Sequence, residues 1–205
     1  MEKKVRKYAK IYRAALCTRN MVEIDKHIAS YENRLRDMYA SEAFQDHNIY
    51  PTMDVYKIYA VIAMCLELKQ KNLSDREIIE TINSGFGKLK KMLAAVEKLI
   101  DALPCAYSIA RKWNVSDHES RVKDGSITYD YFHVTDGKIE YRISKCMYIE
   151  MFEYYGIRSL CKIFCLTDEA AYANLTRHVE FIRHSDLSDG TCCHDEVLDK
   201  KKYNV

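Results

Sequence analysis

Apolar residues recur at three- and four-residue steps over the first half of the chain. Residues 5–16, 24–38 and 55–68 carry this spacing, which predicts amphipathic helices. The third segment is the most apolar, so we expect it to be the central buried helix. Ser74 followed by Glu77 forms a capping box, in which each residue bonds to the backbone N–H of the other, and this predicts the start of another helix.

The helical repeat continues beyond a Gly-Phe-Gly sequence at residues 85–87, where glycine can adopt the left-handed conformation that ends a helix. Residues 88–103 form the next predicted helix, and residues 105–113 extend the helical region. We expect one row of side chains to face the core: Leu89, Met92, Leu93, Val96, Leu99 and Ile100. Residues 115–126 are polar and are predicted to form a loop.

Beyond residue 114 the helical repeat gives way to alternation and to β-forming residues. The predicted elements are a hairpin of strands 127–134 and 139–143, a helix at 147–155, a helix or helix pair at 159–175, and strands at 178–184 and 193–198. The fold class is therefore α+β. We expect a single domain over residues 1–205, in which a helical part (1–113) packs on a small antiparallel sheet in an α/β part (127–199).

Composition excludes several classes of protein. With 6 glycines and no glycine-rich loop, the chain lacks the phosphate cradle of Rossmann and P-loop enzymes. A net charge of +2 argues against a nucleic-acid partner. The longest uncharged apolar run, Ile58 to Leu66, is far shorter than the ~20 residues that span a bilayer. No secretory signal is evident, so we expect a cytoplasmic protein with a small-molecule ligand, no membrane contact and reduced thiols. The oligomeric state is left open.

The cysteines cluster toward the C-terminus. Of 8 in the chain, five lie within 48 residues: Cys146, Cys161, Cys165, Cys192 and Cys193. On the predicted helix, Cys165 and Asp168 are three residues apart and share one face. Cys146, Cys165 and either Cys192 or Cys193 could meet at one site, as metal ligands or with one as a nucleophile. Spacing alone favours the other interpretation, in which they are small buried residues, because there is no Cys-x-x-Cys pair.

Two charged residues lie within otherwise apolar segments. Asp168 needs a partner there, and Arg183 on an alternating strand could supply it. Arg183 could alternatively bind a substrate carboxylate through its guanidinium fork. The residue pattern does not separate a substrate site from a structural ion pair.

Five short motifs occur in order: Lys-Cys-Met-Tyr at 145–148, Glu-Tyr-Tyr-Gly-Ile at 153–157, Phe-Cys-Leu-Thr-Asp at 164–168, Phe-Ile-Arg at 181–183 and Gly-Thr-Cys-Cys at 190–193. Together they resemble the L-2-amino-thiazoline-4-carboxylic acid hydrolase family. The fold is also similar to the 4-vinyl-reductase-like superfamily, whose members include non-enzymatic sensors. The resemblance thus implies either a hydrolase or a non-catalytic module that binds a small molecule or a metal.

For the hydrolase, the resemblance implies hydrolytic ring opening of a cyclic amidine that carries a carboxylate, with a carbamoyl-cysteine as product and a place in L-cysteine metabolism. Arg183 would hold the carboxylate, Asp168 would act as base or orient the reacting groups, and Cys165 or Cys193 would be the nucleophile. In the alternative mechanism Cys146, Cys165 and Cys193 would hold a divalent metal such as zinc, whose hydroxide attacks. No other cofactor is implied.

Overall fold

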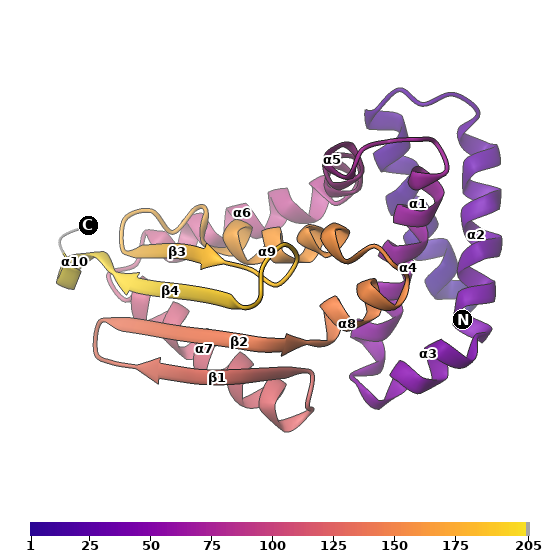
Figure 1. The fold of residues 1–205 in the computed structure, drawn as a ribbon. Coiled ribbons are helices and arrows are strands. Elements are labelled where there is room, and N and C mark those ends of the chain that lie inside the picture. The colour runs from indigo at the N-terminus through magenta and orange to yellow at the C-terminus, as the bar shows by residue number, and fades with distance from the viewer. Residues whose placement is uncertain (204–205) are drawn as a thin grey trace. The chain divides into compact units, whose positions relative to one another are not determined.

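A computed structural model describes residues 1–203 and contains a helical N-terminal region followed by a sheet with further helices (Figure 1). The elements are, in chain order, α1 (Glu2–Thr18), α2 (Ile24–Ala40), α3 (Glu42–Asp46), η1 (His47–Ile49), α4 (Thr52–Lys69), α5 (Asp75–Gly85), α6 (Gly87–Asp101), α7 (Ala106–Lys123), β1 (Ile127–Val134), β2 (Lys138–Cys146), α8 (Met147–Tyr154), η2 (Arg158–Cys161), α9 (Lys162–Tyr172), β3 (Val179–Ser185), β4 (Cys193–Asp199) and α10 (Lys200–Tyr203).

The chain forms two compact units. The first, here named the helical unit, comprises Met1–Lys88 and Met151–Ile163. The second, here named the sheet unit, comprises Leu89–Glu150 and Phe164–Val205. Each unit is therefore built from two separate segments of the chain.

The centre of the helical unit is α4, as its apolar sequence predicted. Every residue from Ile58 to Cys65 is fully buried, and α4 contacts α1, α2 and α5. The predicted capping box also forms at the start of α5, where Ser74 and Glu77 bond reciprocally. None of the helices within residues 1–203 combines the length and apolarity needed to cross a membrane.

Gly85, the last residue of α5, is required for a reason other than the one that the sequence suggested. It is not among the glycines with a positive φ angle, so no left-handed cap is formed there. Instead, a Cβ atom built at this position would lie 2.6 Å from the carbonyl oxygen of Ile11 in α1. The glycine is needed because two helices approach each other closely.

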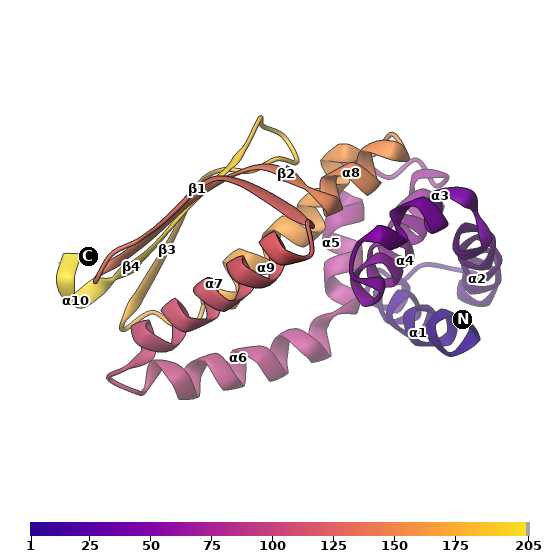
Figure 2. The ribbon, with the colours of Figure 1, turned by 90° about the horizontal axis from the view of Figure 1, so that it is seen from below.

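The sheet unit confirms the α+β prediction. Its four strands are antiparallel in the order β1-β2-β4-β3, and all lie between residues 127 and 199. Helices α7 and α9 lie beneath one face of the sheet, and no helix in the described part of the sheet unit covers the opposite face (Figure 2). The core between α7 and the sheet includes Tyr107 and Ala110 from the helix and Ile139, Val179 and Val197 from the strands.

The prediction of a loop over residues 115–126 is wrong, because α7 continues to Lys123. Its last turns face the sheet with polar side chains, which a search for apolar periodicity cannot detect. His118 stacks on Phe132 of β1, with ring centroids 3.9 Å apart, and contacts Tyr129 edge-on. This aromatic packing supplies the tertiary contacts that hold the polar end of the helix in place.

The prediction that α6 buries its apolar row is also wrong for five of its six residues, and Ile100 alone of the row packs against the core of the sheet unit. Leu89, Met92 and Leu99 are 48%, 59% and 72% exposed. The buried residues of α6 are acidic instead: Glu97 accepts a hydrogen bond from Asn174 and Asp101 accepts one from the backbone N–H of Arg177. These bonds satisfy the backbone and side chains of the segment that leads into β3, and they turn the polar face of α6 inward.

We predict that Gly85→Ala lowers the free energy of unfolding by about 1–3 kcal/mol, because α1 and α5 must separate to admit the methyl group. Gly87→Ala is the matched control. A Cβ atom there meets nothing within 4 Å, so its effect should stay within ~0.5 kcal/mol. Chemical denaturation of both variants measures the difference, and equal effects would contradict the close approach of the helices.

Candidate functional site

A buried ion pair joins β3 to β4 at the centre of the candidate site. Arg183 and Asp195 are direct cross-strand partners. The guanidinium donates from Nε to Oδ1 at 2.9 Å and from Nη2 to Oδ2 at 2.8 Å, a bidentate arrangement. The two side chains are only 9% and 1% exposed, so the pair lies within the protein, on the face of the sheet that the helices cover.

The same guanidinium connects the sheet to α9. Its Nη2 donates to Asp168 Oδ2 at 2.9 Å, and its Nη1 donates to the carbonyl oxygen of Cys165 at 2.5 Å. The predicted contact between Arg183 and Asp168 is thus confirmed. Four hydrogen bonds to protein acceptors occupy most of the five N–H donors of an arginine. These contacts favour the structural ion pair over a free anion clamp.

Carboxylates outnumber the cation at this position. Besides Asp168 and Asp195, Glu169 lies 3.8 Å from Arg183 Nη1. Burial alone would lower the pKa of the guanidinium, but its hydrogen bonds to Asp195 and the neighbouring negative charges outweigh burial and raise the pKa. Arg183 therefore stays charged at any pH the protein meets. The surplus negative charge also disfavours a second anion beside the pair.

Asp168 differs from Asp195 in its access to solvent. Its side chain is 54% exposed, yet the protein around the carboxyl raises its pKa above the usual value, and the charge of Arg183 offsets this only in part. The Asp168 carboxyl therefore has protein around it and a side chain that solvent still reaches. Such a group can accept a proton nearer to neutral pH than an ordinary aspartate can.

Cys146 lies where β2 ends and α8 begins. Burial raises the pKa of its thiol to about 11, although the backbone N–H groups of Ile149 and Tyr148 act in the opposite direction. The Cys165 thiol and the Asp168 carboxyl are close enough to raise that pKa further. Cys146 is therefore a neutral thiol at pH 7, beside the other candidate groups.

Cys193, rather than Cys192, is the cysteine that faces the ion pair. It pairs with Ile143 across the sheet and lies two residues before Asp195, so both project to the same face. Burial raises the pKa of the Cys193 thiol, with further contributions from Cys165 and Cys146. Cys192 instead contacts Ser185, with its carbonyl oxygen 2.9 Å from the serine Oγ.

The proposed thiol ligands of a metal do not form a compact set in this structure. Among residues 1–203, one set of three histidine, cysteine or carboxylate side chains has its ligand atoms all within 4.8 Å of one another, and that set contains no cysteine. A metal bound by Cys146, Cys165 and Cys193 together would therefore require their side chains to move. The observed arrangement suits proton transfer and thiol chemistry better than metal binding.

The pattern of apolar and polar residues missed two parts of the site. Asp195 is the most buried acidic partner, and Tyr141 lies opposite it on β2. The signal was present in the alternation of β4, where Cys193, Asp195 and Val197 are buried and the residues between them are less so. A charged residue in the inward series of a strand indicates a buried partner.

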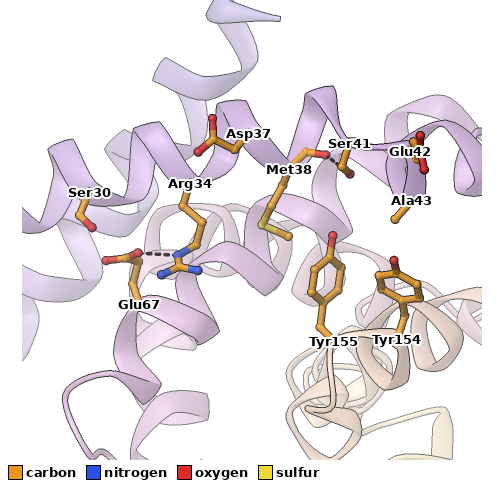
Figure 3. Close-up of a pocket in the computed structure, with 10 residues that line it drawn as sticks. All are labelled: Ser30, Arg34, Asp37, Met38, Ser41, Glu42, Ala43, Glu67, Tyr154 and Tyr155. Carbon is orange, nitrogen blue, oxygen red and sulfur yellow. Dashed lines mark hydrogen bonds and ion pairs between the residues drawn. The ribbon is translucent and has the colours of Figure 1, made fainter.

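A separate pocket of about 680 Å³ lies within the helical unit (Figure 3). Tyr154 and Tyr155 form one wall, and Arg34 bonds to Glu67 across another part of it at 2.5 Å. The sequence interpretation of the two tyrosines as a helix end is correct, since α8 ends at Tyr154. None of the cysteines, and none of the groups around Arg183, lines this pocket.

Comparison with protein families identifies the family of this chain. The family model of L-2-amino-thiazoline-4-carboxylic acid hydrolase matches residues 55–195. Comparison with curated proteins and with solved structures finds no significant match. The matched range contains every cysteine of the candidate site together with Asp168, Arg183 and Asp195.

We predict that Asp195→Asn lowers the free energy of unfolding by about 3–5 kcal/mol, because it leaves the buried Arg183 charge without its bidentate partner. Glu169→Gln removes an exposed carboxylate from the same guanidinium and should cost less than ~1 kcal/mol. Thermal and denaturant unfolding of both variants test this difference. Similar losses in the two would show that the ion pair is not the main stabilising contact.

Proposed function

Because the chain belongs to the L-2-amino-thiazoline-4-carboxylic acid hydrolase family, we propose that it opens the ring of a small cyclic amidine such as 2-amino-thiazoline-4-carboxylate. Family membership supports a hydrolase-type function. The observation that carries the finer proposal is that Arg183 bonds both to the Asp168 carboxylate and to the backbone carbonyl of Cys165, all within the matched range. A thiol, a carboxylate and a fixed cation are groups that addition to an amidine carbon can use.

Asp168 fits the role of general base. It is the one carboxylate of the ion-pair cluster that combines a raised pKa with a solvent-accessible side chain and a direct bond to Arg183. Arg183 fixes the orientation of this carboxylate, while Asp195 holds the guanidinium from the other side. In this proposal Arg183 acts as a positioning residue, because protein acceptors occupy most of its N–H donors.

Cys165 is the best candidate for the nucleophile. Cys146 and Cys193 are held as neutral thiols by burial, which makes them poor nucleophiles at neutral pH. Cys165 is partly exposed and lies three residues before Asp168 on α9, so the two side chains share one face of the helix.

In the proposed reaction, Asp168 accepts the thiol proton while the Cys165 sulfur adds to the amidine carbon. The bond from that carbon to the ring sulfur breaks, and the released sulfur takes a proton. Water then attacks the same carbon, which frees Cys165 and leaves an N-carbamoyl product. The sum is one substrate plus one water, with no oxidant or reductant. If the ring nitrogen leaves instead, the product is the S-carbamoyl isomer.

Asp168→Asn should lower kcat for 2-amino-thiazoline-4-carboxylate by about 10²–10⁴-fold, because the amide cannot accept the proton. Glu169→Gln, one residue away on the same helix, should retain activity. Loss of the substrate measures the reaction by either route, and release of free thiol identifies the N-carbamoyl product. In the wild type, the acidic limb of kcat/KM should lie above the usual aspartate pKa, since the pKa of Asp168 is raised. A fully active Asp168→Asn variant would contradict the assignment.

Cys165→Ala separates two routes to the same product. Loss of activity together with a covalent adduct trapped on wild-type Cys165 would support thiol attack. Full activity in this variant would overturn the assignment of the nucleophile and leave Asp168 to activate water directly. Tight binding of the substrate by the wild type without any turnover would instead favour the non-catalytic binding module.

Arg183→Lys tests whether the guanidinium positions the catalytic groups or binds the substrate carboxylate. Lysine keeps the charge but cannot bond to Asp195, Asp168 and the Cys165 carbonyl in the same fixed geometry. We expect a lower melting temperature and a lower kcat, with KM changed less than ~3-fold. A large rise in KM with an unchanged melting temperature would instead identify Arg183 as the anion clamp.

A further inference from the structure

The face of the sheet opposite the helices carries a second group of reactive side chains. His184 on β3 and His194 and Glu196 on β4 project from this face, and their ligand atoms all lie within 4.8 Å of one another. Among the described residues of the sheet unit, no helix covers this face (Figure 2). The group is thus separated from the thiols and the ion pair by the thickness of the sheet.

Strand register produces this arrangement. His194 and Glu196 are two residues apart on β4, so their side chains project in the same direction. An irregularity between Arg183 and Ser185 leaves two residues of β3 opposite one residue of β4, and His184 is the extra residue. Its imidazole lies over that of His194, with ring centroids 4.5 Å apart, and its Nε2 is 3.4 Å from Glu196 Oε1.

We propose that His184, His194 and Glu196 bind a divalent transition-metal ion, with zinc the first candidate. Imidazole nitrogen and carboxylate oxygen are the ligands that such ions take, and two histidines with one carboxylate leave coordination positions open for water. The three side chains are 43%, 30% and 17% exposed, so an ion can reach them from solvent without any opening of the fold.

Neighbouring charged groups on β2 contact His194 and Glu196. Glu140 on β2 accepts a hydrogen bond from His194 Nε2 at 3.2 Å, a contact typical of the outer carboxylates that orient metal-binding histidines. Lys138 places its ammonium 2.8 Å from Glu140 and 3.0 Å from Glu196. The positive charge of the lysine partly neutralises the carboxylates that attract a metal ion. It should therefore weaken metal binding without preventing it.

The test uses the purified full chain stripped of metal and titrated with Co²⁺, followed by competition with Zn²⁺. We expect one equivalent of Co²⁺ to give visible d–d bands without the near-ultraviolet band of thiolate coordination. His184→Ala and His194→Ala should each weaken binding at least ~10-fold. His133→Ala removes an exposed histidine from the same face of β1 and should bind as the wild type does.

The Lys138→Met variant should change the affinity for metal in the opposite direction to the histidine variants. Removal of the competing ammonium should tighten metal binding about fivefold, the equivalent of one exposed charge interaction. Metal binding that persists unchanged in both histidine variants, a thiolate band in the Co²⁺ spectrum, or no binding by the wild type and Lys138→Met proteins would each overturn the proposal. Circular dichroism of every variant confirms that the fold is retained.

Discussion

The bidentate pair between Arg183 and Asp195 is the interaction on which the sheet unit depends most. A charged guanidinium that is 9% exposed is stable only if its donors meet acceptors, and the strand register supplies a carboxylate directly opposite it. The same group then fixes α9 through Asp168 and the carbonyl oxygen of Cys165. One buried cation therefore sets the relative positions of two strands, one helix and the candidate catalytic groups.

Differences in burial give the residues of the site different chemical properties. Cys146 and Cys193 are kept as thiols because their environment disfavours the anion, whereas Asp168 remains open to solvent. The open face of the same sheet carries histidines and carboxylates instead. Since alternate residues of a strand point to opposite faces, β3 and β4 each contribute to both groups without mixing them.

Helix α6 shows how local bonds can override an apolar pattern. Its acidic residues Glu97 and Asp101 face inward because the segment that leads into β3 has donors that need acceptors there. Unpaired buried N–H groups cost more free energy than an exposed leucine does, so the polar face of the helix is the one that packs. Its apolar face is left on the surface.

The sequence by itself determined the strands, the α+β class and most of the helices, because apolar spacing and capping residues act locally. The contact of Asp168 with Arg183 was also predictable, since a charge in an apolar segment needs a partner. Only the tertiary structure decided that Asp195 is the main partner, that Cys193 rather than Cys192 faces it, and that His118 belongs to a helix. Each of these depends on strand register or on packing between distant segments, and neither is encoded in the spacing of residues along one segment.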